Sequence, residues 1–135
     1  MFSKNQRIGF GATICVAFLS VSATAEIDVS KLPPASTKTG LSYEKDIKPL
    51  FEKSCYKCHG PEKQKGKLRL DSLEAVMKGG ESGKIIEGKD SAKSTVVVAV
   101  SGLDEDTAMP PKDKAPPLTK EEQGLLRAWI EQGSK

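Results

Sequence analysis

The sequence predicts one mostly helical domain, and three observations support this. Apolar residues recur at helical spacing before residue 55 and again after residue 119, and both stretches carry helix-start signals. No internal repeat divides the 135 residues. We therefore place a single domain at residues 42–135, after an N-terminal stretch of different composition.

The first helix is expected to end just before residue 55. Its apolar residues fall at i, i+3 and i+4, on one helical face: Ile47, Leu50 and Phe51. Ser42 is a candidate N-cap. Pro49 interrupts the pattern, so it either kinks the helix or lies in the first turn of a helix that begins near Lys48.

The last helix carries clearer signals. Thr119 and Glu122 form a capping-box pattern, and Leu118 can pack as its hydrophobic staple. Gly133 suits the position after the C-cap. The apolar face of this helix consists of Leu125, Leu126, Trp129 and Ile130. We expect it to pack against the apolar face of the first helix.

A short helix is expected between these two. Asp71 with Glu74 predicts its start, and the pair Gly79–Gly80 predicts its end. Before it, residues 68–70 alternate like a short extended segment. The apolar residues of this region are expected in the core: Leu68, Leu70, Leu73, Val76 and Met77.

The run Val96–Val100 leaves two structures open. Its β-branched residues favour a strand by propensity, yet Ser91 or Ser94 could cap a helix across the same positions. Periodicity does not decide between them over so short a run.

Residues 1–25 have the composition of a secretory signal peptide. Lys4 and Arg7 precede a mostly apolar stretch from Ile8 to Val21, and Ala23-Thr24-Ala25 is a small-residue cleavage site. The apolar stretch has 14 residues, whereas a membrane-spanning helix needs about 20. We expect cleavage and a periplasmic or secreted protein, with a retained membrane anchor as the alternative.

The next residues, 26–41, contain Pro33 and Pro34 and little apolar content, which indicates a flexible linker or an irregular N-terminal arm. Removal of Lys4 and Arg7 with the signal peptide leaves 19 basic and 18 acidic side chains. The processed chain therefore lacks the basic excess typical of nucleic-acid-binding proteins, and we expect no such partner.

The most informative motif is Cys55-Tyr56-Lys57-Cys58-His59. C-x-x-C-H is the spacing at which two thiols reach both vinyl groups of one haem while the next residue ligates the iron. Positions three apart lie about one helical turn apart, which puts both thiols and the imidazole on the same side. His59 is the only histidine and the motif occurs once. It predicts one covalently attached haem c.

Two other chemistries share part of this motif. C-x-x-C occurs in thioredoxin-like redox pairs and as half of a zinc site. A thioredoxin-like motif follows a strand in a βαβ pattern, which the sequence lacks. Zinc would need a fourth ligand, and after removal of residues 1–25 no further His or Cys is left. Both are the weaker alternatives.

A second chemically distinctive stretch surrounds Met109. This methionine lies in a polar loop stiffened by Pro110 and Pro111, where a residue that only fills the core is out of place. A thioether held by such a loop suits the second axial position of a haem iron. Met77 is the rival ligand, although its place in a helical apolar pattern suits packing.

These residues belong to a longer ordered series of landmarks: I-x-P-L-F-x-x-x-C-x-x-C-H at 47–59, K-G-K-L-R-L-D-S at 65–72, G-G-E-S-G at 79–83, G-K-D-x-x-x-S at 88–94, M-P-P-K at 109–112 and L-x-x-W-I-x-x-G at 126–133. The series resembles the planctomycete-type cytochrome c domain, a small class I-like c-type cytochrome, over residues 43–133. One departure is Ala108, where a basic residue is frequent in such domains.

The resemblance implies an all-α, class I-like cytochrome c fold, with the N- and C-terminal helices packed together around one covalently bound haem. It implies Cys55 and Cys58 as the thioether attachments, His59 as the proximal iron ligand and Met109 as the distal one. It also favours a helix over residues 94–100.

An iron with His and Met ligands has no vacant position for a substrate, so the expected function is one-electron transfer between a redox protein donor and acceptor, not enzymatic catalysis. The alternative is a haem-based enzyme or gas sensor with a labile distal ligand. The chain supplies neither a distal histidine nor an obvious acid–base pair for it.

Lysines are frequent near the proposed haem-binding residues: Lys53, Lys57, Lys63, Lys65 and Lys67 around the motif, and Lys112 and Lys114 after Met109. They are either ordinary solvated surface residues or a basic rim that steers an acidic redox partner toward the haem edge. The sequence leaves both interpretations open.

Overall fold

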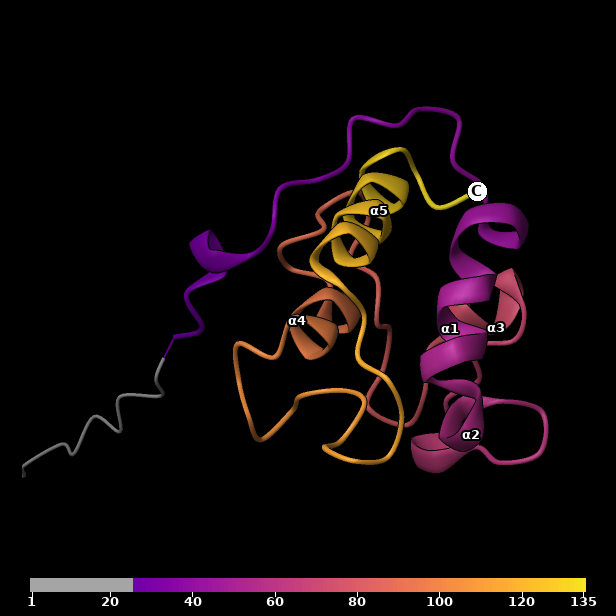
Figure 1. The fold of residues 1–135 in the computed structure, drawn as a ribbon. Helices are drawn as coiled ribbons and strands as arrows, with labels where there is room; N and C mark the ends of the chain where they lie inside the picture. Colours follow the sequence, from indigo (N-terminus) through magenta and orange to yellow (C-terminus); the bar gives the residue numbers. More distant parts are fainter. Residues whose placement is uncertain (1–25) are drawn as a thin grey trace, which may run out of the picture.

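The computed structural model describes residues 26–135, whose regular elements are all helical (Figure 1). In chain order they are η1 (Val29–Lys31), η2 (Tyr43–Ile47), α1 (Lys48–Ser54), α2 (Tyr56–His59), η3 (Lys65–Lys67), α3 (Leu73–Lys78), α4 (Thr95–Ser101) and α5 (Lys120–Glu131). No strand occurs in these residues, which contain only isolated β-bridges. The described part of the chain is therefore all-α, as expected.

The predicted signal peptide, residues 1–25, lies outside the described residues. From residue 26 onward, no helix has both the length and the apolar composition to cross a membrane.

α1 begins at the position that Pro49 favours. A five-residue π-helical turn, η2, ends at Ile47, and α1 starts at Lys48 with Pro49 in its first turn, where a missing N–H costs nothing. The first-turn interpretation of Pro49 is thus confirmed. The three apolar residues of the predicted face are buried: Ile47, Leu50 and Phe51.

The start of α5 is the predicted capping box. The Thr119 N–H donates to Glu122 Oε2 at 2.8 Å, and the Glu122 N–H donates to Thr119 Oγ1 at 3.2 Å. Leu118, the expected staple, is buried. Gly133 directly follows the C-cap with a φ of +101°, a left-handed conformation that glycine adopts without strain.

An aromatic cluster joins the two ends of the domain. The ring centroid of Tyr43, in η2, lies 6.1 Å from that of Trp129 in α5 and 6.4 Å from that of Phe51 in α1. All three side chains are almost fully buried. α5 therefore meets the N-terminal helical segment through Tyr43 of η2, a residue that the sequence analysis did not single out. On its other side α5 packs against α4 (Figure 1).

The connecting region differs from expectation in two details. The N-cap of α3 is Ser72, whose Oγ accepts a hydrogen bond from the Ala75 N–H at 3.2 Å, and not Asp71. Met77 is 40% exposed and not part of the core, because α3 turns its neighbour Val76 inward instead. The run Val96–Val100, left open between strand and helix, lies in helix α4.

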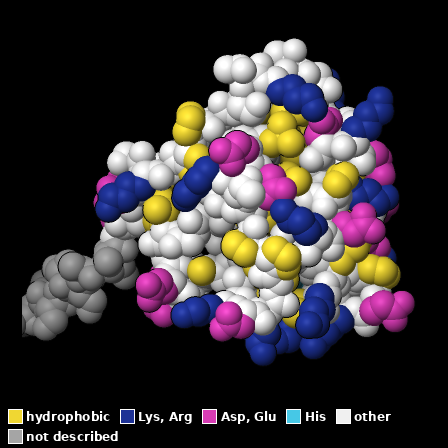
Figure 2. Space-filling view, viewed as in Figure 1, with side chains coloured by type: hydrophobic (Ala, Val, Ile, Leu, Met, Phe, Trp, Pro, Cys, Tyr) yellow, Lys and Arg dark blue, Asp and Glu magenta, His cyan; other side chains and the backbone are white. Residues whose placement is uncertain are grey.

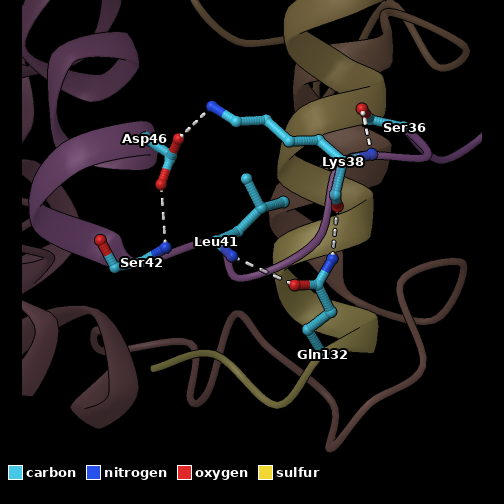
Figure 3. Close-up of polar contacts among 6 residues, drawn as sticks. All are labelled: Ser36, Lys38, Leu41, Ser42, Asp46 and Gln132. Atoms are coloured by element: carbon cyan, nitrogen blue, oxygen red, sulfur yellow. Dashed lines mark hydrogen bonds and ion pairs between the residues drawn. The ribbon is translucent and has the colours of Figure 1, made fainter.

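Residues 32–41 form an arm that crosses α5 before the chain enters η2 (Figures 1 and 3). Gln132 binds the arm at both ends of its side-chain amide: its Nε2 donates to the Lys38 carbonyl at 2.8 Å, and its Oε1 accepts from the Leu41 N–H at 3.2 Å. Asp46 then accepts from Lys38 Nζ at 2.7 Å and from the Ser42 N–H at 2.9 Å. The arm is thereby linked to both α5 and η2.

Gly124 permits the close approach of the arm to α5. Its carbonyl accepts from the Ser36 N–H at 2.9 Å, and a Cβ at this position would lie 2.6 Å from the Pro34 carbonyl oxygen. The Arg127 guanidinium also donates to the Pro33 carbonyl. A glycine inside a helix lowers helix propensity by about 1 kcal/mol, and here it makes room for the arm's backbone.

Candidate functional site

The four residues predicted to bind haem all line one cavity of about 680 Å³. Cys55, Cys58 and His59 border it from the α1–α2 region, and Met109 borders it from the loop between α4 and α5. Most of the cavity wall is apolar, with Pro110, Pro111 and Ala115 beside Met109. The fold thus brings together residues that are about 50 positions apart in the sequence.

A break between two helices presents the motif to the cavity. α1 ends at Ser54, and Cys55 leaves helical geometry at φ −124° and ψ −30°. The Cys55 carbonyl then accepts from both the Cys58 N–H and the His59 N–H, at 3.1 and 2.9 Å, closing the single turn of α2. Gly60 follows, where a Cβ would lie only 2.5 Å from the Tyr56 carbonyl oxygen.

The two cysteines are free, partly buried thiols. Burial, with a smaller contribution from the neighbouring Cys58, raises the pKa of the Cys55 thiol to about 12. Cys55 is therefore a neutral thiol at pH 7. No group of three or more His, Cys, Asp and Glu side chains in residues 26–135 could hold a metal ion.

The imidazole of His59 has one nitrogen inside the protein. Its Nδ1 is buried and has no hydrogen-bond partner, whereas the residue as a whole is partly exposed and lines the cavity. By elimination, Nε2 is the ring nitrogen available to a ligand bound in the cavity. On the backbone side, the His59 carbonyl accepts from the Leu70 N–H at 2.8 Å, which ties the motif to the chain that follows it.

Met109 is fixed through its backbone and keeps an accessible side chain. Its N–H donates to the Ala99 carbonyl in α4 at 2.8 Å, and its side chain lines the cavity. Met109 and the rival Met77 are equally exposed, at 40% each, but Met77 does not border the cavity. The structure therefore places Met109, and not Met77, with the C-x-x-C-H motif.

These residues fit the haem that the motif implies. The cavity volume is within the range of about 300–1,000 Å³ typical of cofactor sites, and the wall is mostly apolar as such sites are. Two thiols and one imidazole nitrogen border the cavity together with a thioether from another segment. An imidazole whose Nδ1 is turned into the protein has Nε2 free for a metal.

Four lysines also border the cavity: Lys57, Lys63, Lys65 and Lys114. All four are exposed, and none forms an ion pair with another residue in the described part of the chain. Lys53, by contrast, pairs with Glu122 of α5, and neither Lys67 nor Lys112 borders the cavity. Figure 2 shows basic side chains gathered at the lower edge of the molecule, in the region of α2 and the loop before α5.

The sequence analysis does not predict a close contact between glycines that forms part of the cavity wall. Gly66 borders the cavity with a φ of +62°, and its carbonyl accepts from the Glu81 N–H at 2.8 Å. A Cβ on Gly80 would lie 2.6 Å from that same carbonyl oxygen. In the sequence, the glycines of residues 79–83 indicate only the end of a helix and a part of the series that resembles the family. Their close approach to Gly66 is a tertiary contact, for which the sequence carries no local signal.

Residues 55–113 match a family model described as Planctomycete cytochrome C. The match includes the C-x-x-C-H motif and Met109 and covers somewhat less than half of the chain. Searches of curated proteins and of solved structures returned no match.

Proposed function

We propose that the protein is an exported one-electron carrier with one covalently bound haem, because residues 55–113 match the family model of planctomycete cytochrome c. Haem binding by a c-type domain follows from the family. One haem, its His/Met ligation and the role in electron transfer are the proposal. The main observation in support of this proposal is that one mostly apolar cavity is lined by Cys55, Cys58, His59 and Met109.

Each of these residues has a role in the proposal. Cys55 and Cys58 would attach the group through thioether bonds, and His59 Nε2 and Met109 Sδ would be its proximal and distal ligands. The bound haem supplies a one-electron change between Fe(III) and Fe(II). The protein contributes fixed ligands and an apolar wall. A thioether ligand and exclusion of water both favour the reduced, less charged state.

The arrangement of the helices supports a class I-like fold. Tyr43 packs against Phe51 of α1 and Trp129 of α5, so the N-terminal segment lies against the last helix, as a class I-like fold requires. We propose that the haem occupies the cavity beside this junction. Export rests on the composition of residues 1–25, and a periplasmic or secreted location is part of the same proposal.

The first test is an optical spectrum of the protein matured in an exporting host that assembles c-type haem. We expect a low-spin c-type spectrum in the oxidised and reduced states, unchanged when carbon monoxide is added to the reduced protein, because His59 and Met109 would both ligate the iron. Protein that matures without any haem would contradict the proposal.

One observation favours the second candidate, a haem-based enzyme or gas sensor. Met109 is 40% exposed, and an accessible ligand is more easily displaced than a buried one. A prompt spectral shift with carbon monoxide in the native protein would select this candidate. The hydrogen bond from the Met109 N–H to the Ala99 carbonyl fixes the backbone of this residue and so favours a firmly held ligand. We therefore prefer the function of an electron carrier.

We also propose that the unpaired lysines at the cavity form a docking surface for redox partners with an acidic face. Lys57, Lys63, Lys65 and Lys114 give a local charge of +4, whereas residues 26–135 have only one more basic than acidic side chain. Charge close to the point of electron exit determines how a charged partner is steered. These four lysines, named here the cavity lysines, are the candidates for that steering.

The salt dependence of electron transfer to small reagents tests this docking surface. Raising the ionic strength from about 0.01 M to about 0.15 M shortens the Debye length from about 30 to about 8 Å. Oxidation of the reduced protein by anionic hexacyanoferrate(III) should therefore slow, by about tenfold. Oxidation by a cationic cobalt(III) tris-phenanthroline complex should accelerate.

Two charge-matched variants locate the effect. Replacing the four cavity lysines by glutamine should abolish both salt dependences. Replacing four exposed lysines that do not line the cavity, Lys78, Lys84, Lys89 and Lys120, should preserve them, although the net charge changes equally. If the oxidation rates of the two variants depended equally on ionic strength, only the net charge would matter, and the proposal of a docking surface would be refuted.

A further inference from the structure

One residue, Leu70, connects the haem-binding motif to the buried core. Its N–H donates to the His59 carbonyl at 2.8 Å, and its own carbonyl accepts from the Tyr43 hydroxyl at 2.5 Å. Leu70 is buried. The peptide groups on either side of Leu70 thus hold two hydrogen bonds, one directed to the motif and one to a side chain 27 positions earlier.

Tyr43 is itself fixed from two sides. Its backbone N–H donates to the Lys135 carbonyl at 2.7 Å, and the Trp129 Nε1–H donates to the same oxygen at 2.9 Å. Its ring is 1% exposed and packs between Phe51 and Trp129. Burial raises the pKa of the Tyr43 hydroxyl, so this group stays protonated and remains a donor. A continuous set of contacts therefore runs from α5 through Tyr43 and Leu70 to His59.

We propose that Tyr43 is a positioning residue for His59, acting through Leu70. This inference rests on the proposed function, in which the His59 imidazole is the proximal haem ligand. The Tyr43 hydroxyl fixes the carbonyl of Leu70, the Leu70 N–H fixes the carbonyl of His59, and the aromatic cluster makes this support rigid. The backbone that carries the proximal imidazole is thereby held by the core and not only by the short helix α2.

The physical reason is the cost of leaving Leu70 without its partner. A buried carbonyl that loses its donor either stays unsatisfied or moves to find water. Movement of Leu70 would strain or break its bond to His59, because the two hydrogen bonds share one residue. Outer-shell contacts of this kind orient metal-ligating histidines and tune the metal.

The test compares two variants of the haem-loaded protein. Tyr43→Phe removes the hydroxyl that binds Leu70. Ser134→Ala is the control: its hydroxyl is also buried and has no hydrogen-bond partner, and Ser134 does not border the cavity. The main readout is hydrogen–deuterium exchange of the Leu70 amide, followed by NMR on the reduced, diamagnetic protein. The second readout is the reduction potential.

We expect Tyr43→Phe to accelerate exchange of the Leu70 amide by about tenfold relative to amides in α5, the factor that corresponds to one typical net hydrogen bond. The reduction potential should fall, because a looser proximal segment admits water and favours the oxidised state. Ser134→Ala should change neither. Unchanged Leu70 exchange in Tyr43→Phe, or equal changes in both variants, would overturn the positioning role.

The unmodified protein provides a test that does not depend on the folding of Tyr43→Phe. With both hydrogen bonds in place, the Leu70 amide should exchange no faster than the amides inside α5. Faster exchange through local opening would contradict a rigid support. If the proposed function were wrong, the c-type haem spectrum itself would be absent. That outcome is distinct from any change in the exchange of the Leu70 amide.

Discussion

Replacing Met109 by alanine should leave the protein folded with haem attached, yet make the reduced protein bind carbon monoxide at once. Among residues 26–135, Met109 is the one methionine that borders the cavity, and alanine offers no donor atom to the iron. The reduction potential should fall by on the order of a tenth of a volt or more, since axial ligands set haem potentials over a range of about 0.8 V. Optical titration with carbon monoxide and a spectroelectrochemical titration measure the two effects.

Met77→Ala is the matched control for this experiment. Met77 and Met109 have the same exposed fraction, 40%, so the two substitutions remove equally accessible thioethers. Met77 lies on α3 and does not border the cavity. The control should keep the potential and the insensitivity to carbon monoxide. A native-like spectrum and potential in Met109→Ala would show that another group is the distal ligand.

Replacing Cys55 and Cys58 together by alanine should abolish covalent haem attachment altogether. Both thiols border the cavity on the turn that ends at His59, and alanine cannot form a thioether. Each single substitution should leave one attachment. Haem that co-migrates with the polypeptide under denaturing conditions, detected by its peroxidase activity in a gel, distinguishes the three variants.

Ser54→Ala is the control for this second experiment. Ser54 directly precedes Cys55, borders the same cavity and has a buried hydroxyl without a hydrogen-bond partner. Its substitution therefore alters the same wall and leaves both thiols in place, and covalent haem should be retained. Covalent haem in the double cysteine variant would refute the assignment of Cys55 and Cys58.

Features that depend on neighbouring residues were predictable from the sequence. The capping box of Thr119 and Glu122 requires only residues three positions apart, and the first turn of α1 follows from the fixed φ of Pro49. The C-x-x-C-H motif is likewise local, because its function is encoded in its spacing. In each case the residues concerned contact one another within one or two helical turns.

Features that depend on distant contacts were not predictable in the same way. Val76 and Met77 are adjacent and both apolar, so pattern alone did not show that α3 buries the first and exposes the second. In the sequence Tyr43 is one more apolar residue before the first helix. The hydrogen bond from its hydroxyl to the Leu70 carbonyl joins segments 27 positions apart, so it becomes visible only in the folded chain. Seven lysines surround the motif and Met109 in the sequence, but only the fold shows which four border the cavity.

The route of the arm also determines which helices take up tension from the preceding chain. Residues 32–41 cross α5 along the contacts to Gly124 and Gln132, at the end of the view in Figure 1 that is opposite α2. Tension on the chain upstream of the arm would therefore reach α5 and η2 first, because the arm is hydrogen-bonded to both. In a tethered form of the proposed carrier, the arm would thus bear the load and the residues around the cavity would not.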